Sequence, residues 1–240
     1  MKRTQHRKNI QVPAKLKKEG TELYFSSYKI TDSPIKTNNG TLPRLVKNQL
    51  EDIFDLIKTD PKQVIEKLLV LKEAYPQAPV LYNYLSAAYG RIGNSKAMQE
   101  LVLENYHKNP NYLFAKINYA QLCLNKGEFE KIPEIFDNKF DLKMLYPIRN
   151  TFHVTEFSGF TSVMCAYYCS IGERDAAQLL FDSLKELTPG SAMVNYAKRF
   201  LHPSLITKLI RWVYKKRHEQ INKLETQEQK ETHDYNSLEG

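Results

Sequence analysis

The spacing of glycine and proline residues is the feature that most constrains what this chain can fold into. Gly93 is followed 17 residues later by Pro110, and Gly172 is followed 17 residues later by Pro189. A tyrosine stands four residues before each of these two glycines. A pattern that recurs at a fixed period of roughly 20–50 residues is typical of repeat proteins, in which each unit buries its apolar face against its neighbours.

The repeat length is 34 residues in the middle of the chain, where Gly93 and Gly127 are 34 residues apart. The next step, from Gly127 to Gly172, is 45 residues, which is one period plus 11. We therefore expect an insertion near residues 141–157.

Apolar residues recur with helical periodicity from about residue 41 to about residue 201. The segment 79–93 has a proline near its start and a glycine at its end, the asymmetry expected of a helix. Helices are predicted over 63–76, 79–93, 95–110, 111–127, 158–172, 173–189 and 191–201.

The segment 158–189 carries a full set of small, aromatic, turn and helix-stopping residues: Cys165, Tyr168, Gly172, Ala177, Phe181 and Pro189. This pattern resembles the tetratricopeptide repeat, a helix-turn-helix unit of about 34 residues. Residues 79–112 fit the same pattern, and residues 45–76 fit it only in their second half. The unit at 113–146 departs from it, because Pro133 lies inside its second helix.

The resemblance implies an all-α fold: a right-handed α-solenoid of helix-turn-helix (tetratricopeptide-like) repeats with a C-terminal capping or amphipathic helix. We expect a basic, largely disordered N-terminal arm at 1–40, a repeat domain at 41–201, and an amphipathic basic helix with an acidic tail at 202–240. Within the arm, only residues 22–30 have the aromatic and β-branched composition of a strand.

In this repeat family the first helix of each pair lines the concave face, which by position gives nine candidate partner-binding residues. They are Asn83, Tyr84, Ala87, Phe114, Ile117, Asn118, Gln121, Ser162 and Ala166. Such a face is neutral, with amide and aromatic character, and suits an extended or helical peptide held by apolar anchors and amide hydrogen bonds. The aromatic and aliphatic members would serve equally well as packing between repeats.

The net charge of +8 is concentrated at the ends of the chain. Residues 1–20 carry seven lysines and arginines against one glutamate, and residues 203–224 form an amphipathic, basic helix candidate. That helix would cap the last repeat, or lie on an anionic membrane surface or a partner. The arm would be a solvated tail or a contact to nucleic-acid phosphates.

Motifs for catalysis or cofactor binding are missing from the sequence, including those for nucleotides and zinc. Cys165 and Cys169 lie four residues apart on one predicted helix, but free cysteine packs as a small apolar residue. His153 and Glu156 would form an acid–base pair or a helix start. We expect no enzyme activity, no cofactor and no metal.

The first function hypothesis is therefore a non-enzymatic protein–protein interaction module or adaptor that binds a partner peptide or helix in its concave groove. The alternative is a peripheral binder of anionic membrane or nucleic acid through the basic ends. Three cysteines without paired spacing favour the reducing cytoplasm. No apolar stretch reaches the roughly 18 residues of a transmembrane helix.

Overall fold

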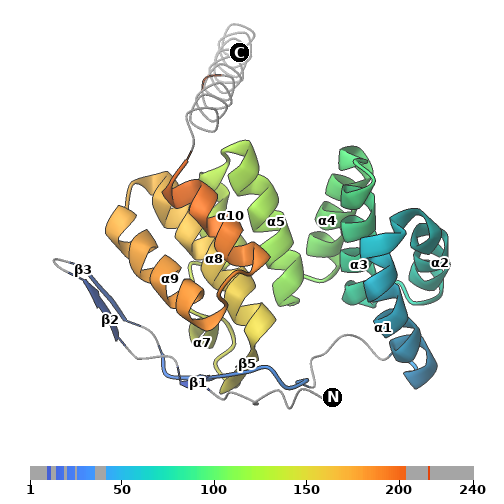
Figure 1. Ribbon diagram of the computed structural model, residues 1–240, viewed down its shortest axis with the longest axis horizontal. Helices are drawn as coiled ribbons and strands as arrows, with labels where there is room; N and C mark the ends of the chain where they lie inside the picture. Colours follow the sequence, from blue (N-terminus) through green and yellow to red (C-terminus); the bar gives the residue numbers. More distant parts are fainter. Residues whose placement is uncertain are drawn as a thin grey trace, which may run out of the picture.

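The computed structural model describes residues 10–11, 15–18, 21–24, 26–35, 42–203 and 216, and this part of the chain is mostly helical (Figure 1). Its helices are α1 (Arg44–Thr59), α2 (Pro61–Ala74), α3 (Pro79–Arg91), α4 (Ser95–Lys108), α5 (Leu113–Lys126), α6 (Ile132–Ile135), α7 (Leu142–Leu145), α8 (Val154–Ile171), α9 (Arg174–Leu187) and α10 (Ala192–Leu201). The all-α class is confirmed. Each of the seven helices predicted from periodicity is present, with its ends within four residues of the prediction.

Local sequence signals explain where these helices begin and end. The side chains of Asp60 and Asn94 accept hydrogen bonds from backbone N–H groups at the start of α2 and α4, which satisfies donors that a helix leaves unpaired. Helices α5 and α8 end at Gly127 and Gly172, whose φ angles of 83° and 96° suit glycine. Pro133, expected inside a longer helix, stands in the first turn of α6, which is only four residues long.

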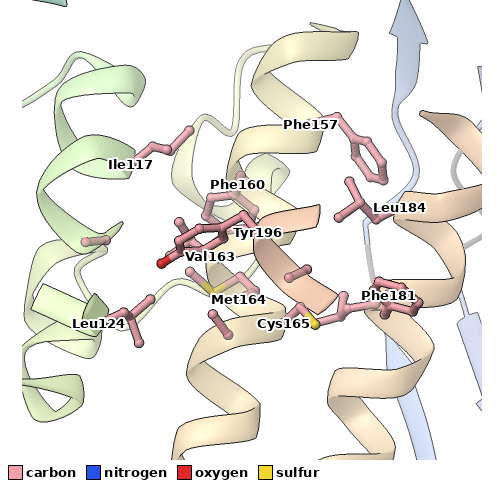
Figure 2. Packing of buried hydrophobic residues seen from close by; sticks show 14 of the residues in the cluster. Ile117, Leu124, Phe157, Phe160, Val163, Met164, Cys165, Phe181, Leu184 and Tyr196 are labelled. Atoms are coloured by element: carbon pink, nitrogen blue, oxygen red, sulfur yellow. The ribbon is translucent and has the colours of Figure 1, made fainter. Parts of the chain in front are cut away.

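Buried apolar side chains form two clusters, one at each end of the helical array. The first, here the N-terminal core, joins α1, α2 and α3 with Leu101 of α4. The second, the C-terminal core, joins α5 to α10 with strands of the arm. Figure 2 shows Ile117 of α5 and Phe160 of α8 within it, beside Tyr196 of α10. Neighbouring helices pack in sequence order, α3 against α4 and α8 against α9, while α10 covers α8.

Short strands tie the N-terminal arm to the helices. Strand β4 (Lys29–Thr31) pairs antiparallel with β1 (Ile10–Gln11) and parallel with β5 (Thr151–His153). The insertion expected near 141–157 therefore supplies, in β5, a strand against which the arm pairs. A hairpin of β2 (Lys15–Lys18) and β3 (Thr21–Tyr24) lies beside α9 (Figure 1).

Two side chains of the arm enter the C-terminal core. Tyr28 and Ile30 are 4% and 2% exposed, and the Tyr28 ring meets Phe152 edge to face at 5.1 Å between centroids. Burial of this much aromatic and aliphatic surface stabilises the strand, which would not be stable alone. The strand predicted at 22–30 is thus found as parts of β3 and β4.

A three-residue ionic cluster links α2 to α4. The Glu104 carboxylate accepts hydrogen bonds from Lys72 Nζ at 2.7 Å and from Lys108 Nζ at 2.8 Å. Burial raises the pKa of Glu104, but the hydrogen bonds and charges of the two lysines outweigh it, so the net shift is downward.

Most of the predicted end segments lie outside the described residues. These are the basic residues of 1–9 and, apart from 202, 203 and 216, the amphipathic helix and acidic tail of 202–240. Across the described helices, none combines the length and the apolar character that a membrane crossing requires.

Candidate functional site

Two adjoining cavities lie where α3 faces α5, and together they are called the groove below. The aromatic cavity, of about 400 Å³, is lined by Pro34, Ile35, Phe54, Val80, Asn83, Tyr84, Tyr112, Phe114, His153, Thr155 and Glu156. The amide cavity, of about 430 Å³, is lined by Asn83, Ser86, Ala87, Met98, Val102, Phe114, Asn118, Gln121, Leu122 and Asn125. Asn83 and Phe114 line both, so the cavities are neighbours along the same helices.

The aromatic cavity draws its walls from segments far apart in the chain. Phe54 comes from α1 and Tyr84 from α3, and their ring centroids are 6.0 Å apart. Tyr112 and Phe114, at the start of α5, have centroids 5.7 Å apart. The start of α8 and the two residues at 34–35, just after β4, complete the lining. The arm and the insertion therefore bound this end of the groove.

The Tyr112 hydroxyl is a neutral hydrogen-bonding group. Burial raises the pKa of Tyr112 well above its usual value, and the nearby Tyr84 and Glu156 raise it further. Asn83 Nδ2 donates a hydrogen bond to the Tyr112 hydroxyl oxygen at 3.3 Å. The phenol thus keeps its proton at neutral pH and gives the cavity a polar point without a charge.

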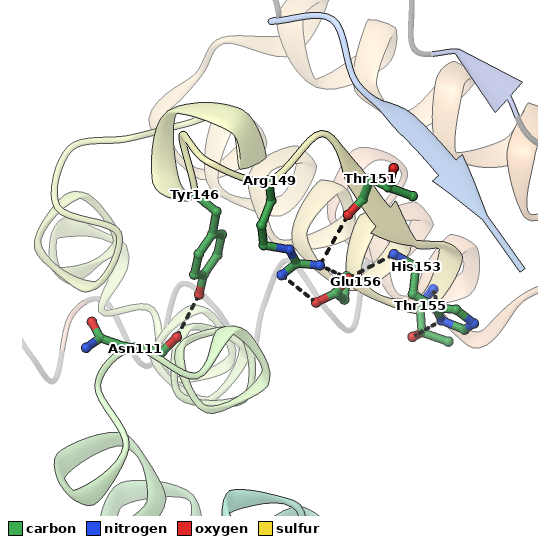
Figure 3. Close-up of polar contacts among 7 residues, drawn as sticks. All are labelled: Asn111, Tyr146, Arg149, Thr151, His153, Thr155 and Glu156. Atoms are coloured by element: carbon green, nitrogen blue, oxygen red, sulfur yellow. Dashed lines mark hydrogen bonds and ion pairs between the residues drawn. The ribbon is translucent and has the colours of Figure 1, made fainter. Parts of the chain in front are cut away.

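Glu156 is buried at the base of α8, where it orders the insertion (Figure 3). Its two carboxylate oxygens accept hydrogen bonds from Arg149 Nη1 at 3.0 Å and Nη2 at 2.6 Å. One of them also accepts the backbone N–H of His153 at 2.8 Å, which completes a capping box. A bidentate ion pair of this kind fixes both partners geometrically.

The imidazole of His153 closes the same capping arrangement. Its Nδ1 accepts the Thr155 backbone N–H at 3.3 Å, and its Nε2 lies 3.3 Å from the Asp32 carbonyl oxygen. Both ring nitrogens are therefore in contact with other groups of the chain. Of the two hypotheses for His153 and Glu156, the helix start is the one that the contacts bear out.

A network of asparagine amides runs beneath the groove and connects α3, α4 and α5. Asn83 Oδ1 accepts hydrogen bonds from Asn105 Nδ2 and from Asn118 Nδ2, each at 3.0 Å. Asn105 is only 2% exposed and donates also to the Pro79 carbonyl at 3.2 Å. Buried amides are stable only when partnered in this way. The network therefore positions Asn83 and Asn118 at the groove floor.

Six of the nine residues predicted for the concave face line the groove: Asn83, Tyr84, Ala87, Phe114, Asn118 and Gln121. Their role in binding a partner stays a prediction. The structure places the other three, Ile117, Ser162 and Ala166, in the interior, at 2%, 0% and 0% exposed.

The covering of α8 by α10 explains why those three side chains are buried. Met193, at the start of α10, brings its sulfur within 3.5 Å of Ser162 Oγ and 3.7 Å of Gln121 Nε2. Ile117 packs against Gly159, where an added Cβ would lie 3.1 Å from Ile117 Cδ1. For these positions the packing alternative describes the structure, and partner contact would require α10 to move.

Several groove residues were not anticipated from the sequence. Phe54 lies on α1, in the half of the unit 45–76 that does not fit the repeat pattern, and Tyr112 precedes α5 by one residue. Ile35 belongs to the arm, and no local signal in the sequence connects it with α3. A wider search for aromatic residues at helix starts would have found Tyr112.

The cysteines contribute packing. Cys123 and Cys165 are 1% and 0% exposed in the C-terminal core, and the Cys165 thiol donates to the Ala177 carbonyl at 3.3 Å. Burial raises the pKa of Cys123 to about 11, so this thiol stays protonated at neutral pH. Within the described residues, histidine, cysteine and carboxylate side chains form no group of three that could hold a metal ion.

Comparison with family models, with curated proteins and with solved structures gives no match. The comparisons therefore indicate no ligand for the groove.

Proposed function

We propose that the helix pairs form a solenoid of the tetratricopeptide type and that the groove binds an extended peptide segment of a protein partner. The protein is then a non-enzymatic interaction module. The observation that carries this proposal is that the two cavities adjoin, since both are lined by Asn83 of α3 and Phe114 of α5.

The polar side chains of the amide cavity suit a peptide main chain. Asn118, Gln121 and Asn125 lie along α5 at intervals of three and four residues, so they project from the same side of that helix. Each carboxamide offers both donors and an acceptor, which matches the N–H and C=O groups of an extended chain. One amide hydrogen of Asn118 is already used by Asn83, and this bond holds the Asn118 side chain in place.

The apolar part of the groove provides anchors. Met98, Val102 and Leu122 line the amide cavity between its polar residues. Alternation of apolar surface with a few fixed polar groups is characteristic of sites that recognise an extended ligand. Repeat architectures commonly place such surfaces on the side formed by the first helix of each pair.

The test is selection of 12-residue peptides from a random display library on the full-length chain, followed by calorimetric titration. Gln121→Ala should weaken the selected peptides by about threefold to tenfold, the equivalent of one hydrogen bond. The matched control is Gln49→Ala, an exposed glutamine of α1 that lines neither cavity. The proposal would be contradicted if a folded Gln121→Ala chain bound the selected peptides as tightly as wild type. It would also be contradicted if peptide binding were lost only when the helical signal of the chain was lost.

The distribution of charge favours a second candidate function. Seven basic residues against one acidic residue in 1–20 would attract phosphate-bearing surfaces of nucleic acid or anionic lipid. Binding of this kind weakens steeply with salt and would be lost on removal of residues 1–20 and 204–240. Capture that survives both treatments would exclude it.

A further inference from the structure

The aromatic cavity has a composition that points to one class of ligand group. Rings of Phe54, Tyr84, Tyr112 and Phe114 line it, in two neighbouring pairs. Aromatic rings carry negative charge on their faces, and cavities built from several rings attract cations, ammonium groups in particular.

The charges around the aromatic cavity also favour a cationic ligand group. Although lysine and arginine outnumber acidic residues in the chain by 35 to 27, none of the described residues that line the cavity is a lysine or an arginine. Glu156 adds a carboxylate to the wall, compensated in part by Arg149 behind it. His153 contributes an imidazole whose two nitrogens lie 2.7 Å from Thr155 Oγ1 and 3.3 Å from the Asp32 carbonyl oxygen. An anionic ligand group would find no lysine or arginine among the described lining residues and would lie near the Glu156 carboxylate.

One ring of the cavity already holds an ammonium group. Lys58 Nζ lies 4.2 Å from the centroid of the Phe54 ring, within the distance at which a cation–π interaction is favourable. This lysine is half-exposed and also bonds Asp55 at 3.0 Å. Phe54 is 50% exposed, so part of its surface is open to solvent even with Lys58 beside its ring.

The hydroxyl groups of the cavity would complete the recognition. Tyr112 and Thr155 line it, and hydroxyl oxygens accept hydrogen bonds from ammonium hydrogens. Both oxygens already have a partner within the chain, since Tyr112 accepts from Asn83 Nδ2 at 3.3 Å and Thr155 Oγ1 lies 2.7 Å from His153 Nδ1, but each has a further lone pair that can accept from an ammonium group. A lysine side chain places apolar methylenes against the rings and its charged end at the oxygens.

We propose that the aromatic cavity binds the ammonium group of a lysine side chain carried by the partner peptide in the groove. This inference rests on the proposed function, because the peptide main chain would lie in the amide cavity. The partner is then a protein segment with an exposed lysine, and the aromatic cavity selects it.

A probe pair tests the cavity without any peptide. Choline and 3,3-dimethylbutan-1-ol have the same shape, and only choline is charged. We expect choline to give saturable changes in the methyl NMR signals of Ile35 and Val80, with the neutral isostere binding about tenfold more weakly, as expected for a partly desolvated cation–π site. Equal binding of the two probes, or no saturable change with choline, would overturn the inference.

Variants assign the effect to the rings. Tyr84→Leu keeps an apolar side chain and should weaken choline about tenfold, whereas Tyr89→Leu on the same helix, which does not line the cavity, should bind as wild type does. Phe54→Leu, at an exposed ring, gives a second measurement if Tyr84→Leu does not fold. Wild-type affinity in a folded Tyr84→Leu or Phe54→Leu chain would count against the proposal.

The peptide selection separates this inference from the function on which it rests. Selected peptides that depend on Gln121 and share a lysine support both. Peptides that depend on Gln121 but show no preference for lysine refute the lysine proposal and leave the groove function standing. Choline binding without any selected peptide would refute the peptide groove and the lysine-bearing peptide with it.

Discussion

The substitution Asn83→Ala should separate the unfolding of the two cores. Asn83 lies on α3, at the junction between the N-terminal core and the helix α5 that begins the C-terminal core. Its side-chain oxygen accepts from Asn105 and Asn118, and its Nδ2 donates to Tyr112. Alanine removes all three hydrogen bonds while keeping a good helix former.

The expected cost follows from what each partner loses. Asn105 is 2% exposed, so its orphaned donor costs about 1–3 kcal/mol. Asn118 is half-buried and can replace the lost bond with one to water, so its loss costs about 0.5–1 kcal/mol. The sum, about 1.5–4 kcal/mol, is a large share of the roughly 5–15 kcal/mol that stabilises a typical domain. With a urea dependence of about 2 kcal/mol per molar, the midpoint of the affected transition falls by about 1–2 M.

The distribution of cysteines allows the unfolding of the C-terminal core to be measured separately. All three cysteines of the chain follow residue 122, and Cys123 and Cys165 are buried in the C-terminal core. Thiol labelling in urea therefore reports that core alone, while circular dichroism reports helices of both. In the wild-type chain the two curves should coincide. In Asn83→Ala, ellipticity should begin to fall at lower urea, while the thiols stay protected.

Asn125→Ala is the matched control, because this asparagine is exposed near the end of α5. It should leave both curves within about 0.3 M of wild type, as surface substitutions usually do. If Asn83→Ala behaves like Asn125→Ala, the amide network does not stabilise the junction. If both probes shift together by the full amount, the two cores unfold as one unit and the separation inferred from their packing is wrong.

Three further predictions concern stability. Gly172→Ala should lower the free energy of unfolding by about 1 kcal/mol, because the φ of Gly172 is 96°. Gly90→Ala should raise the free energy of unfolding by about 0.5–1 kcal/mol, because Gly90 lies in helix α3 and an added Cβ would make only ordinary contacts. Urea titration of both variants checks that the two changes have opposite signs. Arg149→Met should cost about 3 kcal/mol of stability, because it leaves the buried Glu156 carboxylate without its ion-pair partner. Adding Glu156→Leu should recover part of that loss. Purely additive losses in a double-mutant cycle would contradict the prediction. Glu104→Gln should lower the free energy of unfolding above pH 4.5. The difference in this free energy between wild type and variant should fade as pH drops from 4.5 through the lowered pKa of folded Glu104, because the wild-type carboxylate becomes protonated. A difference independent of pH would refute the prediction.

Most of the helical framework was predictable because its signals are local. Glycines at 127 and 172 end α5 and α8 through a backbone geometry that depends on a few neighbouring residues. Pro133 stands in the first turn of α6, where a missing N–H is tolerated, so the proline does not explain why that helix has only four residues. Successive helices pack in sequence order, α3 against α4 and α8 against α9. The groove face was predictable in part, because Asn118 follows Tyr84 and Gln121 follows Ala87 by 34 residues.

The burial of Ser162 and Ala166 could not be predicted in the same way. Periodicity gives the face of a helix on which a residue lies, but not which other helix covers that face. Helix α10 packs on α8 because its own apolar side chains, such as Tyr196 and Phe200, need a surface to cover. The sequence contains both faces, and only their packing shows that they meet.

By itself the sequence determined the helices, their ends, the repeat period and the place of the insertion, because capping, glycine geometry and helical periodicity act over a few residues. Tertiary structure alone decided the rest of the site. The parallel pairing of β4 with β5, and the contact of His153 with the Asp32 carbonyl 121 residues away, bring the arm to the groove. Contacts of that range depend on the packing of the whole chain, and no local pattern records them.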